Sequence, residues 1–219
     1  MFNVTRLIHI ASHANRDKLL EDLRRQTDVA DICHAIVEPT LPGSRNGGDI
    51  LMHLRFHTAQ HWADLAPHLS HLLTTGAGGI RAVDGVDYTG VGRQVDDAGP
   101  GTTYRTLLLR LAPGTSEDAI HRFENDLESM PAYVRTITAW QLSRVEKSTG
   151  ATEWTHVFEQ HFTDANGITG PYLMHPIHWG YVDRWFDPEC PEYIVRDRVC
   201  HSFCRSNTHV LGTPQIAIP

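Results

Sequence analysis

The stretch GRQVDDAGPGT, Gly92–Thr102, divides the chain into two halves that show the same order of predicted elements. It is polar and rich in Gly and Pro, a composition typical of a linker. We assign residues 1–95 to a first repeat, 96–102 to the linker, 103–211 to a second repeat and 212–219 to a C-terminal tail. Residues 1–95 and 103–211 are therefore expected to fold as two copies of one motif.

The spacing of apolar residues on either side of this linker predicts strands and helices in a repeated order. In the first half, strands are expected at Val4–Ile10, Ile32–Pro39, Asp49–Phe56 and Ile80–Val91, and helices at Arg16–Gln26 and Ala59–Leu73. In the second half, strands are expected at Tyr104–Leu111, Val134–Glu146, Glu153–Phe162 and Ile194–Cys204, and helices at Ser116–Ser129 and His178–Trp185. Each half thus has the order βαββαβ.

This order is the ferredoxin-like motif, in which a four-stranded antiparallel sheet carries its helices on one face. The other face of each sheet is left bare, and the bare faces of two sheets can bury each other. We therefore predict an α+β fold in which tandem ferredoxin-like repeats enclose a barrel-like core within one chain.

The composition narrows the class of function. Hydrophobic residues make up 41% and charged residues 21% of the 219 residues, as in a globular protein with a substantial core. Because 26 Asp and Glu outnumber 19 Lys and Arg, the net charge of −7 argues against binding to nucleic acid or an anionic membrane. Fifteen His residues are unusually many, which points to acid/base or metal chemistry.

The location of the protein is predicted from what the sequence lacks. No apolar run has the length of a membrane span, and the N-terminus lacks the features of a secretory signal. Four Cys residues are too few for a disulfide scaffold at this length. We therefore expect a cytoplasmic protein whose partner is a small-molecule substrate, with a homodimer left open.

Candidate chemical groups concentrate in EWTHVFEQHF (Glu153–Phe162) and PYLMHPIHWGYVDRWF (Pro171–Phe186). Tyr172, His175 and His178 recur at a spacing of three, which places them near one surface of a helix or tight turn. A pocket holding these groups with His156 of the preceding strand would contain a phenol and three imidazoles. The aromatic residues expected to line it and bind substrate are Trp154, Phe158, Trp179 and Trp185.

This region resembles the stress-responsive dimeric α/β-barrel (Dabb) family, whose members include a plant polyketide cyclase. The family pattern Tyr-x-x-His-Pro-x-His-x-Gly-x-x-Asp-x-x-Phe is met here by Tyr172, His175, Pro176, His178, Gly180, Asp183 and Phe186. The resemblance covers residues 103–204 well and the first half more weakly. His53 in the first half is expected to correspond to His156, and the first half is interpreted as a structural partner with a degenerate site.

The resemblance implies a cofactor-independent cyclase, lyase or isomerase acting on an enolisable carbonyl or polyketide-like compound. His178 would be the general base and Tyr172 the hydrogen-bond donor to the carbonyl oxygen. His156 would orient the substrate or relay a proton, with His175 as a further catalytic candidate. One departure affects the substrate: many relatives have a His early in the first strand, where this chain has Arg105 and Thr106.

Three alternatives stand beside this interpretation. The chain could be a non-catalytic, stress-responsive oligomeric barrel, or His156, His175 and His178 could bind a metal ion. A pocket rich in His would also suit haem. Cys200 and Cys204 are too far apart on one strand to share an ion, and Asp183 beside Arg184 is interpreted as a local ion pair or a helix-end feature.

Overall fold

A computed structural model describes residues 1–196 and 198–211, so the tail predicted at 212–219 lies outside the described residues. The first half contains β1 (Phe2–Ile10), α1 (Arg16–Thr27), β2 (Ile32–Pro39), β3 (Ile50–Phe56), α2 (Ala59–Leu73) and β4 (Ile80–Thr89). The second half contains β6 (Thr103–Leu109), α3 (Glu117–Tyr133), β7 (Ile137–Arg144), β9 (His156–Phe162), a helical segment and β10 (Cys200–Arg205). The predicted order βαββαβ is confirmed in both halves.

The strands form two antiparallel sheets with the orders β2-β3-β1-β4-β8 and β10-β6-β9-β7-β5. In each half, the first strand lies between the fourth and the third, and the third lies beside the second, which is the ferredoxin-like arrangement. The fold class predicted from the sequence is therefore correct.

Two short edge strands, which the sequence analysis did not predict, are exchanged between the halves. β8 (Lys147–Thr149) belongs to the second half and pairs with β4 of the first sheet. β5 (Arg93–Gln94) lies in the polar stretch before the linker and pairs with β7 of the second sheet. Their backbone pairing links the two halves.

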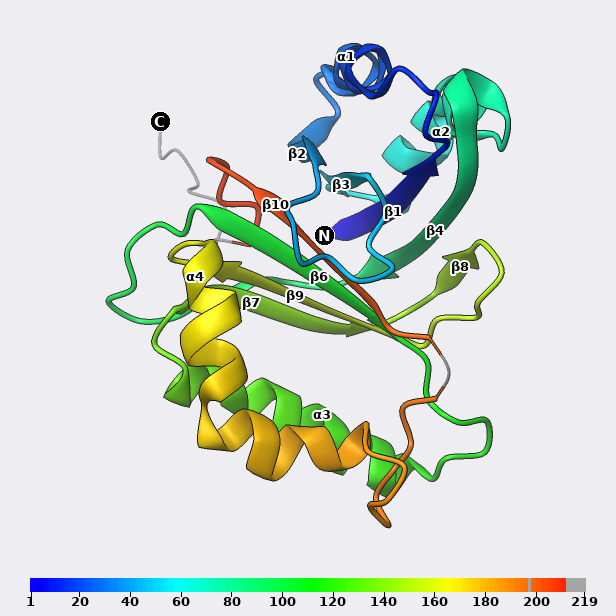
Figure 1. Cartoon of the computed structure of the whole chain (residues 1–219). Coiled ribbons are helices and arrows are strands. Elements are labelled where there is room, and N and C mark those ends of the chain that lie inside the picture. Colours follow the sequence, from blue (N-terminus) through cyan, green and yellow to red (C-terminus); the bar gives the residue numbers. More distant parts are fainter. Residues whose placement is uncertain (197, 212–219) are drawn as a thin grey trace.

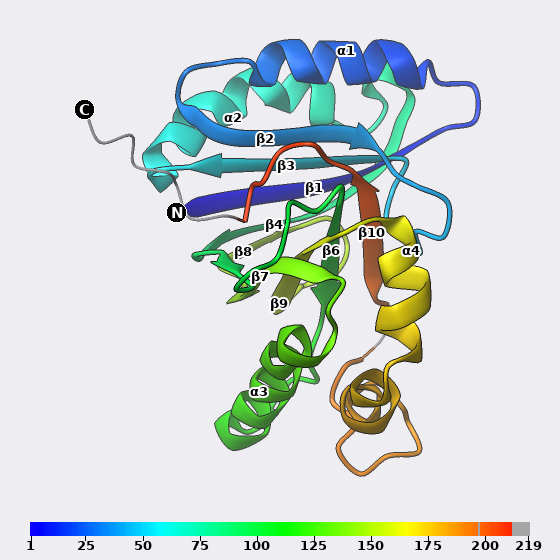
Figure 2. The ribbon, with the colours of Figure 1, turned by 90° about the vertical axis from the view of Figure 1, so that its left-hand side faces the viewer.

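The molecule has four layers, with the two sheets facing each other between two layers of helices (Figures 1 and 2). α1 and α2 cover the outer face of the first sheet, and α3 and the helical segment cover the outer face of the second (Figure 2). The core between the sheets takes side chains from both halves, including Leu7, Leu51, Val86, Tyr104, Leu108 and Val157. This shared core is the barrel-like interior expected from the repeat pattern.

Local signals explain where two of the helices begin. The side chains of Asn15 and Ser116 accept hydrogen bonds from the backbone N–H groups of Lys18 and Ala119, capping α1 and α3. α3 continues to Tyr133, four residues beyond the predicted end, and includes Pro131. The longer helix provides the surface against which the helical segment packs.

The helical segment is longer than predicted and is interrupted once. It runs from Ala165 to Trp185, with a break at His175, and Pro176 begins its second part as expected for a residue without an N–H group. Two of its turns, Ile168–Tyr172 and His178–Val182, are π-helical. Such turns are rare and occur often at functional sites.

The last predicted strand is shorter than expected. β10 begins only at Cys200, although residues before it also pair with the chain just beyond β6: Val195 lies opposite Leu111, and the N–H of Arg196 donates to the carbonyl of Arg110 at 2.8 Å. Within residues 1–196 and 198–211, no helix combines the length and apolar character needed to cross a membrane.

Candidate functional site

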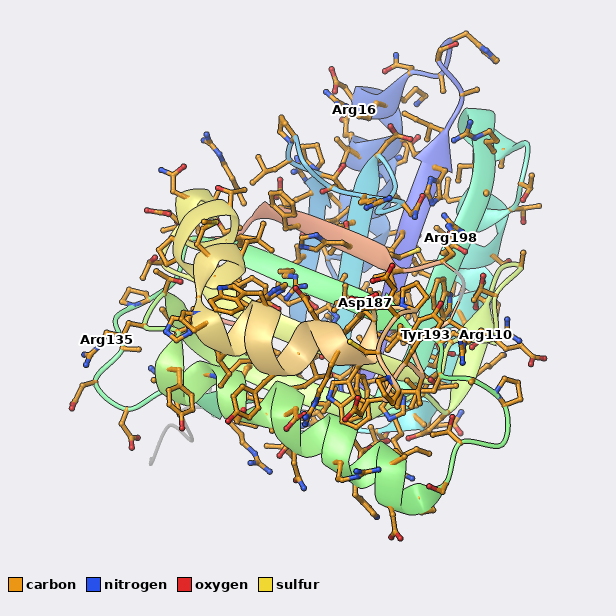
Figure 3. All side chains as sticks on the ribbon, turned by 60° about the horizontal axis from the view of Figure 1, so that its bottom comes forward. Arg16, Arg110, Arg135, Asp187, Tyr193 and Arg198 are labelled. Atoms are coloured by element: carbon orange, nitrogen blue, oxygen red, sulfur yellow. The ribbon has the colours of Figure 1, made fainter. Side chains whose placement is uncertain are left out.

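A cavity of about 410 Å³ lies against the outer face of the second sheet, beneath the helical segment. We call it the site cavity. Its walls come from β6, α3, the helical segment, β10 and the loop between β2 and β3: Arg45, Asn46, Arg105, Leu107, Leu127, Tyr172, Leu173, His178, Val182, Asp183, Phe186, Arg198, Val199 and His201. Its size is in the range of small-molecule sites. Figure 3 shows the helical segment crossing in front of the second sheet, where it covers this region.

Two of the four predicted catalytic residues meet in this cavity. The rings of Tyr172 and His178 are 4.9 Å apart between centroids and are nearly perpendicular, at 71°. Both residues lie in the π-helical turns, one on each side of the break at His175. Tyr172 is almost fully buried, with 1% of its surface exposed. The predicted pairing of phenol and imidazole is therefore present in the structure.

His178 has a carboxylate partner on one ring nitrogen. Its Nδ1 is 3.3 Å from Oδ1 of Asp183, one π-helical turn further along the chain. Burial lowers the pKa of His178, the nearby charge of Asp183 opposes that change, and the charge of Arg105 lowers the pKa further. The imidazole is therefore held in its neutral, basic form at neutral pH.

Asp183 and Arg184 lie in the last turn of the helical segment, so the expected helix-end feature is present and the expected ion pair between them is not. Asp183 instead contacts His178, and Arg184 donates to Oδ2 of Asp126 on α3 at 2.6 Å. Adjacent residues on a helix point in different directions, so neighbours in sequence need not be partners. The sequence pattern of the family includes Asp183, but the contact between Asp183 and His178 depends on the π-helical turn that separates them.

Arg105 forms part of the floor of the site cavity. Its Nη1 donates to Oη of Tyr172 at 2.9 Å and also to Oε1 of Gln160 on β9. Its guanidinium lies over the Tyr172 ring, 4.8 Å from the centroid. Arg105 thus occupies the position where the sequence departs from the family pattern, and it contacts one of the two central residues of the site.

His201 of β10 also lines the cavity, and the sequence analysis did not identify it. Along β10, Cys200 and Cys204 face the core between the sheets, so the alternation of a strand turns His201 the other way. Burial, then the charges of Arg105 and His178, lower the pKa of His201 to about 2. Its Nε2 is buried and has no hydrogen-bond partner among the described residues.

His156 lies apart from the site cavity. Its Nε2 is 3.2 Å from Oε1 of Glu124 on α3, and the same carboxylate accepts a hydrogen bond from Arg144. Burial lowers the pKa of His156, and the hydrogen bond with Glu124 opposes this. His156 and Trp154 line a different hollow, of about 360 Å³. The expected convergence of His156 with His178 is therefore absent.

The side chain of His175 has a structural partner at the break in the helical segment. Its Nδ1 accepts a hydrogen bond from the backbone N–H of Ile177 at 3.2 Å, next to Pro176. It thereby satisfies an N–H group at the start of the second helical part, as a capping side chain does. His175 is not one of the residues that line the site cavity.

The four aromatic residues expected to bind substrate lie elsewhere. Phe158 and Trp185 are buried in the core between the second sheet and its helices, and Trp154 is buried between the two sheets. Trp179 is 61% exposed. The apolar walls of the cavity are instead Leu107, Leu127, Val182 and Phe186.

His53 does not correspond to His156 as expected. Its Nδ1 is 2.9 Å from Oγ1 of Thr5, and its ring lies 5.2 Å from Tyr104, all between the two sheets. His156 faces the opposite way, toward α3. A shift of one residue along a strand reverses the face, so equal positions in two similar strands need not be equivalent.

The three His residues predicted as metal ligands do not come together in the structure. Within the described parts of the chain, no three His, Cys, Asp or Glu side chains are placed to bind one ion. His156, His175 and His178 have separate surroundings, as described above. Haem would need only one of these imidazoles as a ligand.

Comparisons with known proteins agree with this architecture. Residues 103–200 match the sequence profile of the stress responsive A/B barrel domain, Dabb. No curated protein matches the chain. An anthrone oxidase-like protein of known structure is similar over 93% of this chain and 90% of its own, with a TM-score of 0.67 and 11% identity.

Two further solved structures have the same fold. A protein assigned as a monooxygenase from Lactobacillus acidophilus NCFM covers 93% of this chain and 92% of its own, with a TM-score of 0.53 and 10% identity. A mutant chlorite dismutase from Candidatus Nitrospira defluvii covers 94% and 90%, with a TM-score of 0.54 and 8% identity. Identities this low show the fold and not the activity. The profile match therefore relates residues 103–200 to the stress responsive A/B barrel (Dabb) family, and the solved structures show the fold over most of the chain.

Proposed function

We propose that the site cavity binds a small enolisable carbonyl compound, such as a polyketide-like ketone, and that the protein is a cyclase, lyase or isomerase without a cofactor. The observation that carries this proposal is the Tyr172–His178 pair at 4.9 Å in the cavity wall. A base and a hydrogen-bond donor beside each other are what the removal of a proton next to a carbonyl requires.

His178 is suited to the role of base. A hydrogen bond from Nδ1 to Asp183 orients the ring and leaves Nε2 as the basic atom. Because burial lowers its pKa, the neutral form is present at neutral pH and can accept a proton. Nε2 would take the proton from the carbon next to the carbonyl, and the electron pair would move onto the carbonyl oxygen to form an enolate.

Tyr172 is suited to hold that oxygen. Its Oη already accepts a hydrogen bond from Arg105 at 2.9 Å, so the proton of the phenol is free to point toward a substrate. A donor held in place before reaction stabilises the negative charge that develops on the oxygen. The positive charge of Arg105 behind the phenol strengthens this donation.

The roles predicted for His156 and His175 stay predictions, as does substrate binding by Trp154, Phe158, Trp179 and Trp185. These residues would have to act from outside the site cavity. The proposal therefore rests on Tyr172 and His178. A homodimer also stays a prediction, which light scattering of the purified protein would test.

Deuterium exchange tests the proposed step before any product is known. The protein is incubated in D₂O with a panel of 1,3-diketones, 3-oxo acids and aromatic polyketide-like ketones, and proton NMR follows loss of the signal next to the carbonyl. We expect catalysed exchange, reduced by about 10²–10⁴ in His178→Gln and also reduced in Tyr172→Phe. His68→Gln is the control, because His68 is exposed on α2 of the first half.

Exchange at the wild-type rate in His178→Gln would overturn the assignment of the base. Absence of catalysed exchange across the panel would favour the non-catalytic barrel. A haem titration followed by visible absorbance tests the remaining alternative: a new absorption band that is lost in His178→Gln would support haem at this site.

A further inference from the structure

The guanidinium of Arg105 is a buried cation on the floor of the site cavity, with only 4% of the residue exposed. Its Nη1 makes two hydrogen bonds, to Tyr172 and Gln160. The Nε atom is buried without a partner, and no hydrogen bond joins the edge formed by Nε and Nη2 to any described residue. One side of a fixed, planar donor group is therefore unused.

No carboxylate among the described residues neutralises Arg105. Asp183, the one acidic side chain among the described residues that line the cavity, contacts His178. The other two arginines buried in the described part of the chain have carboxylates near them. Arg6 pairs with Asp87 at 2.7 Å. Arg55 is close enough to Glu159 that its charge opposes the rise in the pKa of Glu159 caused by burial. Arginine keeps its proton in proteins, and a buried charge without a counterion is costly. Something outside the protein is expected to supply the negative charge.

Other groups that line the cavity also favour the binding of an anion. Arg45 and Arg198 line it, and although Arg198 is paired with Asp84 at 2.7 Å, Arg45 is exposed on the loop between β2 and β3. His201 is neutral at any ordinary pH, and its buried Nε2 has no partner. A positive cavity in a chain of net charge −7 concentrates anions locally.

We propose that the site cavity binds a carboxylate through the free edge of Arg105, with His201 as a second hydrogen-bonding partner. Two parallel N–H donors match the two oxygens of a planar carboxylate. A tetrahedral phosphate would use more donors and charge than this floor offers. If the proposed function holds, on which this extension rests, the substrate is a keto acid with its carboxylate on Arg105 and its carbonyl oxygen on Tyr172.

Binding of unreactive acids tests the proposal without any catalysis. Calorimetry and thermal shift are measured with benzoate and phenylacetate, with benzamide as the neutral counterpart of benzoate, and with inorganic phosphate. We expect the carboxylates to bind and to raise the melting temperature, and benzamide and phosphate to bind more weakly. Arg105→Gln should weaken benzoate binding at least about tenfold.

Matched variants separate a local effect from a change in net charge or in folding. Arg135→Gln removes the same charge from an exposed position on the other side of the second half from Arg198 (Figure 3), and should bind benzoate as the wild type does. Arg105→Lys keeps the charge but loses the two-pronged geometry, and should be intermediate. Circular dichroism verifies that each variant is folded.

The outcomes of this test are separate from those of the exchange experiment. His178→Gln should lose exchange yet keep benzoate binding. The carboxylate site would be overturned if benzoate bound equally to the wild type and to folded Arg105→Gln and Arg105→Lys, or if neither acid bound. It would also be overturned if benzamide bound as tightly as benzoate, or if phosphate bound more tightly. Benzoate binding without any exchange would leave the carboxylate site standing and remove the catalytic proposal.

Discussion

At the scale of single residues, His178 has two charged neighbours that act on it in opposite directions. Asp183 raises the pKa of the imidazole and Arg105 lowers it, while burial, the largest influence, lowers it. The net result is a pKa below the ordinary 6.5. A base must be neutral to act, so activity that depends on His178 should be constant near neutral pH and should fall as the pH drops through this lowered pKa.

Removal of Asp183 and removal of Arg105 should shift the pKa of His178 in opposite directions. Asp183→Asn removes the influence that raises the pKa of His178, so the titration of His178 should move to lower pH. Arg105→Met removes an influence that lowers the pKa, so the titration should move to higher pH. NMR titration of the imidazole signals, with His178 assigned from His178→Gln and exposed His68 as the reference, measures both shifts. Shifts in the same direction would contradict the proposed arrangement.

Residues of the site differ in how far the sequence could identify them. Tyr172 and His178 lie six positions apart in one segment, so local spacing was enough to bring them together. Arg105 and His201 come from two other strands, and each lines the cavity because of the face its strand presents to the helical segment. Alternation divides a strand into two faces, but it does not say which face meets a given helix.

At the scale of elements, the helical segment is attached to α3 through Asp126. Its Oδ2 accepts hydrogen bonds from Nη2 of Arg184 at 2.6 Å and from Nε1 of Trp185 at 2.7 Å. Trp185 is almost fully buried and packs edge-on against Phe123 of α3. These contacts place the turn that carries His178 over the second sheet. The site therefore depends on a helix that contributes only Leu127 to its lining.

Removal of this attachment should weaken both the fold and the site. Asp126→Ala leaves the buried indole N–H without its acceptor and removes the ion pair with Arg184, so we expect unfolding to become easier by about 1–3 kcal/mol. Urea denaturation measures this loss, and the benzoate titration measures the effect on the cavity. Asn125→Ala is the control, because Asn125 is exposed on the same helix. Equal stability of the two variants would show that Asp126 does not anchor the segment.

At the scale of the whole molecule, the space between the sheets holds polar groups from both halves. His53 of β3 lies 3.4 Å from Glu159 of β9, and Tyr104 donates to the same carboxylate. Burial places the pKa of His53 well below 6.5 and lowers that of His161 to about 3. Both imidazoles are fully buried, so the folded protein keeps them neutral where the unfolded chain would protonate them.

Stability should therefore fall in acid. For His161 the pKa is lowered in the folded state, so the contribution of this residue to stability is complete above pH 6.5 and is lost as the pH falls toward 3. The slope is about 1.4 kcal/mol per pH unit for each such group. Urea denaturation between pH 7 and pH 4.5 measures the slope, which should be reduced by about that amount in His161→Gln and unchanged in Asn125→Ala, an exposed position that does not titrate. An unaltered slope in His161→Gln would contradict a neutral, buried imidazole.

The sequence by itself determined the order of elements, the division into two ferredoxin-like halves and the Tyr172–His178 pair. These features follow from apolar periodicity and from spacing within single segments, which are local properties of the chain. The predicted ends were less accurate, as at β10, which begins at Cys200 and not at Ile194. Val195 still pairs with Leu111, just beyond β6, but outside the continuous ladder of β10.

Only the tertiary structure decided the exchange of β5 and β8, the separation of His156 from His178, and the gathering of Arg105 and His201 in the site cavity. Each depends on which strand face meets which helix, or on backbone pairing between distant residues. A change of one position in a strand reverses its face, so such choices are made by packing of the whole molecule and not by the local sequence.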